Sequence, residues 1–148
     1  MHGKGKLYNK KGDVIYEGFF ADNKKEGKGK LFLENKCVYE GEFLNNFKHG
    51  KGILYYLNGK IKYEGNFVND EAEGDGRIFY EDGSYYIGKF LKGRRNGKGK
   101  VYFKNGNLKA DGYYVYDKME GEGKLVLQNG DYYESFCEWY KARKRKII

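Results

Sequence analysis

Few side chains in this sequence are of the types that usually carry out chemistry. Its 148 residues include two His and two Cys, and the sequence holds only two Ser and no Thr. His2 and His49 each precede a Gly-x-Gly motif at the same place in a recurring pattern, so we expect both to be scaffold residues. The Ser and Cys residues stand alone, and no spacing pairs a nucleophile with a base. The inventory predicts no catalytic centre, no metal site and no cofactor, and therefore a protein that is not an enzyme.

Two further patterns resemble functional motifs but do not predict a reactive site. The repeated Gly-Lys-Gly segments resemble a phosphate-binding loop only superficially, because no Gly-Lys is followed by Ser or Thr and the segments lead into expected strands. Cys37 and Cys137 lie 100 residues apart and match no zinc or redox spacing. They fit a reducing compartment, so we expect a cytoplasmic protein, with a peripheral position at a membrane as the alternative.

Composition excludes several classes. The chain carries 29 Lys and Arg against 21 Asp and Glu, a net charge of +8, which favours anionic partners. Aromatic residues make up 18% of the chain, which argues against disorder despite 23 Gly. No apolar run approaches the roughly 18 residues of a membrane-spanning helix. The N-terminus lacks the apolar segment of a signal peptide, so none is expected.

An internal repeat accounts for most of the glycines. A Tyr-x-Gly pattern places Gly at 18, 41, 65 and 88, Ala110 replaces the Tyr before Gly112, and Ser135 takes the sixth Gly position, giving steps of 23, 24, 23, 24 and 23 residues. A Gly-x-Gly motif begins nine residues after each of these five glycines, and one more lies at 3/5. The alternating step gives a higher period of 47 residues, as a duplicated pair of repeats would.

Each repeat is predicted to be a β-hairpin. Tyr39, Gly41 and Phe43 would share one face of a strand, with Glu40 and Glu42 on the other. Dipeptides such as Asn58-Gly59 tolerate positive φ at both central positions and predict the turn to the next repeat. The extra residue in the longer repeats predicts a longer turn or a bulge. The fold class is therefore all-β, a single antiparallel layer of successive hairpins.

The glycines are expected to form a floor beneath aromatic rings. Gly in a strand is unfavourable unless a large ring from a neighbouring strand covers the bare backbone. A single sheet has no second layer, so the rings must supply the burial. We predict that Gly41→Val destabilises the fold more than Glu42→Ala.

The Tyr-Glu-Gly-x-Phe pattern, with Gly-x-Gly nine residues after its Gly, resembles the MORN (membrane occupation and recognition nexus) repeat over residues 2–135. The resemblance implies an elongated, twisted antiparallel sheet, and the longer repeats look like a variant common in bacterial proteins. Within this family some SET-domain methyltransferases and some lipid kinases carry such repeats beside a catalytic domain. A regulatory fragment of a larger enzyme is therefore one alternative function.

We expect a MORN-repeat domain at residues 1–135, with a half unit at 2–12 and units starting near 16, 39, 63, 86 and 110. Residues 136–148 are expected to be a degenerate C-terminal cap and basic tail. Because the chain opens in the second half of a unit, we expect the first strand of that unit to be missing or to lie in a longer parent chain.

The favoured function is a non-catalytic scaffold that binds a protein partner through its aromatic and glycine-rich face. Open sheet edges would also allow a homo-oligomer. The residues predicted to contact the partner are Tyr16, Phe20, Tyr39, Phe43, Tyr63, Phe67, Tyr86, Phe90 and Tyr114.

The alternative is a peripheral membrane adaptor that binds anionic phospholipid through a basic stripe and a basic tail. A purely structural interpretation is also open. The stripe would then form ion pairs with an acidic column on the adjacent strands (Glu17, Glu40, Glu64, Asp111 and Glu134), and the tail would cap the open edge of the sheet. Nucleic acid is disfavoured because no stacking platform or recognition helix is evident. The anion-binding residues of this alternative are Lys28, Lys30, Arg77, Lys98, Lys100, Lys141, Arg143, Lys144, Arg145 and Lys146.

Overall fold

A computed structural model describes residues 1–135, and within them every regular element is a β-strand. The all-β fold predicted from the repeat pattern is confirmed, because consecutive strands pair antiparallel as hairpins. The predicted cap and tail at 136–148 lie outside the described residues. The strands are β1 (Gly3–Tyr8), β2 (Val14–Ala21), β3 (Lys24–Leu33), β4 (Lys36–Leu44), β5 (Phe47–Tyr55), β6 (Ile61–Val68), β7 (Glu71–Phe79), β8 (Tyr85–Leu91), β9 (Arg94–Tyr102), β10 (Leu108–Val115), β11 (Lys118–Val126) and β12 (Tyr132–Ser135).

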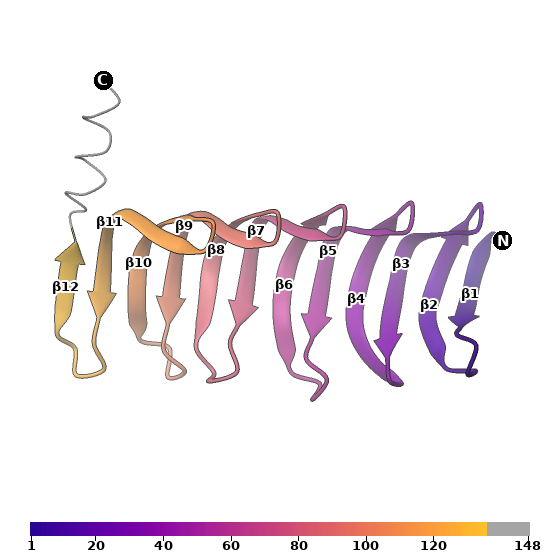
Figure 1. Ribbon diagram of the computed structural model, residues 1–148, viewed down its shortest axis with the longest axis horizontal. Coiled ribbons are helices and arrows are strands. Elements are labelled where there is room, and N and C mark those ends of the chain that lie inside the picture. The colour runs from indigo at the N-terminus through magenta and orange to yellow at the C-terminus, as the bar shows by residue number, and fades with distance from the viewer. Residues whose placement is uncertain (136–148) are drawn as a thin grey trace, which may run out of the picture. The chain divides into compact units, whose positions relative to one another are not determined.

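The chain divides into two compact units, Met1–Gly76 and Arg77–Ile148. In the first unit β1 to β6 are neighbours in the sheet in chain order, and in the second β8 to β12 are (Figure 1). The boundary falls inside β7. Each unit is therefore a run of hairpins whose pairings are local in sequence.

Two kinds of turn connect the strands, and they alternate except at Glu34-Asn35, where a two-residue turn with positive φ at both positions replaces the longer loop. The turn between the Tyr-x-Gly strand and the Gly-x-Gly strand has two central residues with positive φ, as at Asn45 (48°) and Asn46 (74°). Non-glycine residues visit this left-handed region rarely, and Asn and Asp do so most readily. The left-handed pair matches the twist of the flanking strands and forms the tight hairpin turn.

The turns at Asn58-Gly59 and its equivalents differ from the expected form. Gly59 has a φ of 86°, but Asn58 is not left-handed; its side-chain Oδ1 accepts a hydrogen bond from the backbone N of Lys60 at 2.9 Å. The backbone N of Tyr56 donates to the carbonyl O of Lys60 at 2.9 Å, which closes a three-residue loop. The prediction of positive φ at both positions was wrong because the Asn acts through its side chain, while Gly alone takes the left-handed backbone.

The expected bulges are confirmed in the longer repeats. Tyr63 pairs with Leu54 and Ile61 pairs with Tyr55, so Lys62 has no partner opposite it in the ladder. Lys109 occupies the same position in β10, between pairs made by Leu108 and Ala110. Such a bulge is not confined to the longer repeats, because Val38 in the shorter repeat is also skipped, between pairs made by Cys37 and Tyr39.

Tyrosine rings cover the glycines on what we call the core face of the sheet, as expected. A Cβ atom on Gly52 would lie 2.4 Å from the Tyr39 hydroxyl, and one on Gly41 would lie 2.5 Å from the Cα of Gly52. The Tyr39 hydroxyl donates a hydrogen bond to the carbonyl O of Glu42 at 2.8 Å, which satisfies its only donor. Tyr16, Tyr63 and Tyr86 make the same contacts in their own repeats.

Tyr16, Tyr39 and Tyr86 each also pack edge-to-face against two other rings. Tyr39 lies 5.1 Å from Phe43 in its own strand and 5.3 Å from Phe67 in the next repeat, with interplanar angles of 84° and 89°. Such pairs contribute about 0.5–1.5 kcal/mol beyond the apolar area that they bury. The core of each unit is therefore a continuous row of rings.

Candidate binding site

All nine aromatic residues predicted to bind a partner lie in this core. Tyr16, Tyr39 and Tyr86 are 0% exposed, and the most exposed of the nine is Phe20 at 8%. Their burial differs from the accessible row of rings that we expected, because the rings close over the glycines of their own sheet. A partner on this face would contact the side chains around the rings, and the contact role of the nine residues stays a prediction.

Cations lie above several of the buried rings. The Lys48 ammonium is 5.5 Å from the Tyr39 ring centroid, and the Arg95 guanidinium is 4.8 Å from that of Tyr114. A cation at this distance is attracted to the face of the ring. Burial, followed by the neighbouring Tyr114, raises the pKa of the Tyr86 hydroxyl to about 12. The charge of Arg95 opposes this rise.

Backbone and side-chain hydrogen bonds join the tight turns at Asn46, Asp70 and Asp117 to the strand one repeat earlier. Asp117 Oδ1 accepts from the backbone N of Arg95 at 2.8 Å, and the backbone N of Asp117 donates to the Arg95 carbonyl at 2.9 Å. Asn46 makes the same pair of bonds with Lys25, at 2.9 and 3.0 Å. We call this arrangement the turn clamp. It holds Lys25 and Arg95 in place beside the rings.

The opposite face, here the charged face, brings the predicted basic stripe against the acidic column. Strand pairing sets Lys6, Glu17, Lys30 and Glu40 side by side across β1 to β4. In the second unit it sets Lys100 opposite Asp111, and the row continues through Lys124 to Glu134. The sign of the charge therefore alternates from strand to strand in these rows.

The distances support weak pairing of the stripe. Lys30 Nζ is 3.9 Å from Glu40, and Lys100 Nζ is 3.9 Å from Asp111, with all four side chains about half exposed. Exposed pairs of this kind contribute about 0.2–1 kcal/mol. Lys28 lies opposite Glu42, while Lys98 and Arg77 lie over the Tyr113 and Phe79 rings. The candidate residues of the stripe thus have partners within the sheet.

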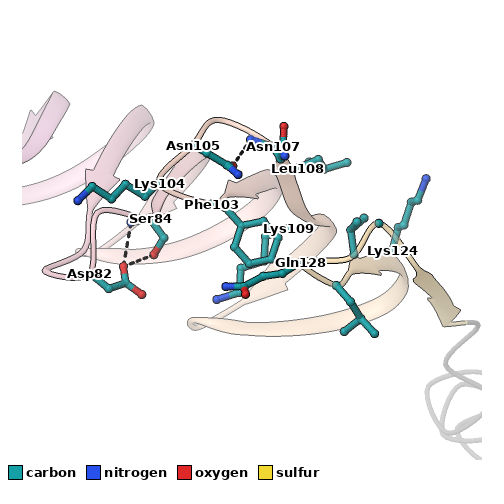
Figure 2. Close-up of a pocket in the computed structure, with 13 residues that line it drawn as sticks. Asp82, Ser84, Phe103, Lys104, Asn105, Asn107, Leu108, Lys109, Lys124 and Gln128 are labelled. Carbon is teal, nitrogen blue, oxygen red and sulfur yellow. Dashed lines mark hydrogen bonds between the residues drawn. The ribbon is translucent and has the colours of Figure 1, made fainter.

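A hollow of about 1130 Å³ opens on the second unit at the ends of three successive loops, 80–84, 103–107 and 127–131 (Figure 2). The loops share one geometry, in which the backbone N of the first residue donates to the carbonyl of the fifth at 2.7–2.8 Å. Repetition of one closed loop fixes the walls of the hollow. Its lining residues are Asp82, Ser84, Phe103, Lys104, Asn105, Asn107, Leu108, Lys109, Lys124, Val126, Leu127, Gln128 and Gly130.

Three lysines, Lys104, Lys109 and Lys124, line the hollow. Lys109 Nζ lies 5.6 Å from the Phe103 ring centroid and Lys124 Nζ lies 4.3 Å from that of Tyr132. The Lys104 stem packs on the preceding loop, 80–84, since a Cβ atom on Gly83 would lie 2.8 Å from its Cγ and Cδ. These contacts direct each long side chain along an apolar surface.

Asp82 is the one carboxylate among the lining residues, and it is engaged. Its Oδ1 accepts hydrogen bonds from the hydroxyl and from the backbone N of Ser84 (Figure 2). These two bonds, with the nearby charge of Lys109, hold the pKa of Asp82 below its ordinary value. The hollow is therefore cationic, with three lysines against one ionised carboxylate.

Lys104, Lys109 and Lys124 are not among the anion-binding residues predicted from the sequence, although a signal for the first two was present. Residues 85–109 contain eight Lys and Arg and no Asp or Glu. The search for a basic stripe compared only positions inside and beside the Gly-x-Gly motif. A count of acidic residues along the chain would have located this segment.

The described residues form no group of three His, Cys, Asp or Glu placed to bind a metal ion. Cys37 is half-buried, and burial, followed by the charge of Glu40, raises the pKa of its thiol. The His49 Nδ1 atom is buried without a hydrogen-bond partner. Residues 1–135 contain no helix of the length and apolarity that a bilayer crossing needs.

These features define an antiparallel hairpin-repeat protein with an aromatic core. The MORN repeat profile matches residues 1–14, 16–38, 39–61, 63–85, 86–108 and 111–132. The chain belongs to the MORN repeat family. Repeats of this family are generally involved in interactions with proteins or membranes, and the family is typically non-catalytic. A comparison with curated proteins gives no match.

Proposed function

We propose that this protein is a non-catalytic scaffold that binds a protein partner. The observation that carries the proposal is the alternation of charge on the charged face, from Lys6 to Glu40 in one unit and from Lys100 to Glu134 in the other. A protein surface can match such a pattern strand by strand. A uniformly anionic surface meets a repulsive carboxylate beside each lysine.

Partner capture followed by reconstitution tests the proposal. The full chain is cross-linked in its native cell, and each captured protein is purified and titrated against the chain by calorimetry. We expect one partner to bind with fixed stoichiometry, and Glu40→Lys or Asp111→Lys to weaken that binding several-fold. Absence of any partner that binds the purified chain would contradict the proposal.

A peripheral membrane adaptor is the second candidate, and a specific observation favours it. The acid-free segment 85–109 carries eight cations, and five more lie between Lys141 and Lys146 in the sequence. Cations near an anionic bilayer contribute about 1 kcal/mol each. Sedimentation with phosphatidylcholine vesicles, with and without one fifth phosphatidylserine, separates the candidates. Binding that needs phosphatidylserine and is lost when Lys144 and Arg145 are changed to Glu would favour the adaptor.

A further inference from the structure

We propose that the hollow between loops 80–84, 103–107 and 127–131 binds an extended segment of a partner protein in which acidic and apolar side chains alternate. This inference rests on the proposed function, since it names where a partner docks and by what chemistry. The three loops belong to one unit and share one hydrogen-bonded geometry. The site is therefore built before any partner arrives.

Charge selects the acidic part of the segment. Lys104, Lys109 and Lys124 line the hollow, and its one lining carboxylate already accepts two hydrogen bonds from Ser84. Lys109 is a bulge residue, so no residue of the neighbouring strand lies opposite it in the ladder. Its ammonium lies over the ring of Phe103, another residue that lines the hollow, where it can form a charge-assisted hydrogen bond with an acidic side chain.

Shape and polarity select the rest. Phe103, Leu108, Val126 and Leu127 supply an apolar surface, and Leu127 is 43% exposed. The amides of Asn107 and Gln128 can pair with peptide groups. A volume of about 1130 Å³ exceeds the roughly 300–1,000 Å³ of small-molecule pockets. Side chains of an extended peptide point alternately to two sides, so an acidic and apolar alternation meets both surfaces.

A membrane fits the hollow less well than a peptide does. The cations lie on the walls of a concavity, which a flat bilayer does not enter. Lys124 also stands between Asp111 and Glu134 in the strand pairing, and these carboxylates repel a uniformly anionic surface. A peptide can place each of its own carboxylates beside one lysine and leave Asp111 and Glu134 in contact with water.

The first test is a binding assay with a defined probe. A fluorescently labelled eight-residue peptide of alternating Glu and Leu is titrated with the full chain and followed by anisotropy. We expect the Glu/Leu peptide to bind about tenfold more tightly than Gln/Leu and Lys/Leu peptides of the same length. We also expect binding to weaken as salt rises from about 0.05 to 0.3 M. Equal affinity for the three peptides would overturn the proposal.

Matched variants locate the site. Lys62 occupies the same bulge as Lys109, and its ammonium lies 5.7 Å from the Tyr56 ring, against 5.6 Å for Lys109 and Phe103. We expect Lys109→Glu to weaken the probe about tenfold, Lys109→Arg to preserve binding, and Lys62→Glu to change it less than twofold. Equal losses from Lys62→Glu and Lys109→Glu would overturn the proposal. If Lys109→Glu alters the circular dichroism spectrum, Lys109→Gln replaces it with the same criteria.

Two further arms separate this inference from the function on which it rests. A captured partner that binds the purified chain equally well after Lys109→Glu and Lys104→Glu would overturn the docking site and leave the scaffold function standing. Phosphatidylserine vesicles that displace the probe, and whose own binding needs Lys109, would assign the hollow to a membrane and overturn the peptide. Displacement of the probe by the captured partner, lost with Lys109→Glu, would support it.

Discussion

The Sδ atom of Met119 lies 2.8 Å from the place that a Cβ atom on Gly123 would occupy. In the preceding repeats a tyrosine ring covers the equivalent glycine, but here the tyrosine position is Ala110, which is buried. Met119 occupies the position that Lys25, Lys48 and Arg95 take elsewhere, beside the ring. The flexible thioether of Met119 on β11 thus fills the space that a tyrosine ring at position 110 on β10 would occupy.

This exchange predicts a dependence between the two sites. Met119→Ala should lower the free energy of unfolding by about 2–3 kcal/mol, because it opens a cavity over Gly123. Ala110→Tyr alone should also destabilise, since Met119 already fills the space. The double variant Ala110→Tyr with Met119→Arg should be more stable than Ala110→Tyr alone. Urea unfolding of the wild type, Ala110→Tyr, Met119→Arg and the double variant measures the coupling, and simple additivity would show that the two positions do not share one space.

Glycine in the floor is predicted to matter more than the neighbouring carboxylate. Any side chain at Gly41 would meet the Gly52 Cα and the Lys51 carbonyl at 2.5 and 2.6 Å, so Gly41→Val should cost about 2–3 kcal/mol. Glu42→Ala removes a 2.7 Å hydrogen bond from the backbone N of Lys51 and should cost about 1 kcal/mol. Thermal melts followed by circular dichroism compare the two variants. The same melting temperature for both would refute the claim that the glycines form a closely packed surface beneath the tyrosine rings.

The turn clamp predicts that the shape of the acceptor matters more than its charge. Asp117→Ala removes the acceptor for the Arg95 backbone N and should cost about 1–2 kcal/mol. Asp117→Asn keeps an Oδ1 acceptor, as Asn46 does for Lys25, and should cost less than about 0.5 kcal/mol. Chemical unfolding at low and high salt measures both variants. A large loss with Asn that salt abolishes would assign the effect to the ion pair with Arg95 instead.

Buried tyrosines predict a loss of stability in alkali. Burial raises the pKa of Tyr63 and of Tyr86 to about 12, above the ordinary value of 10.0. The unfolded chain therefore loses these protons first, so the stability is fully present below pH 10 and falls as pH rises from 10 towards 12. Urea midpoints measured from pH 9 to 11.5 should fall less steeply for Tyr63→Phe with Tyr86→Phe than for the wild type.

The matched control for the alkaline prediction is Tyr116→Phe, since Tyr116 is 53% exposed. This variant should keep the wild-type slope of stability against pH. An unchanged slope in the double variant would show that other groups, such as the lysines, govern the alkaline transition.

Much of the fold could be predicted from the sequence because its signals are local and repeated. The spacing from Gly41 to Gly50 predicted the length of the hairpin. The alternation of Tyr39 and Glu40 predicted which side chains share a face of the sheet. The turn at Asn58 was mistaken because an Asn-Gly dipeptide suits two loop geometries, and the choice depends on which group caps the backbone. The full burial of Tyr86, which is 0% exposed, depends on how closely its ring packs on the glycines of the sheet. The alternation of side chains along a strand does not predict that packing.

The candidate site was less predictable, for a physical reason. Lys104, Lys109 and Lys124 lie on a loop, a bulge and a strand, so no constant spacing relates them. Their approach depends on the closure of three loops that the sequence marks only as turns. The pairing of Lys30 with Glu40 was open for the same reason, because strand register decides it.

The packing of one phenylalanine between the tyrosines of two successive repeats has a consequence for how such a chain changes in evolution. Phe43 packs on Tyr39 of its own strand and on Tyr16 of the repeat before it, so every ring contact is confined to one repeat or its neighbour. Duplication or loss of a whole repeat rejoins rings of the same kinds, and no distant residue has to adapt. Loss of one or two residues inside a strand inverts its faces or breaks the row. Length can therefore vary in whole repeats while the spacing inside each repeat stays fixed.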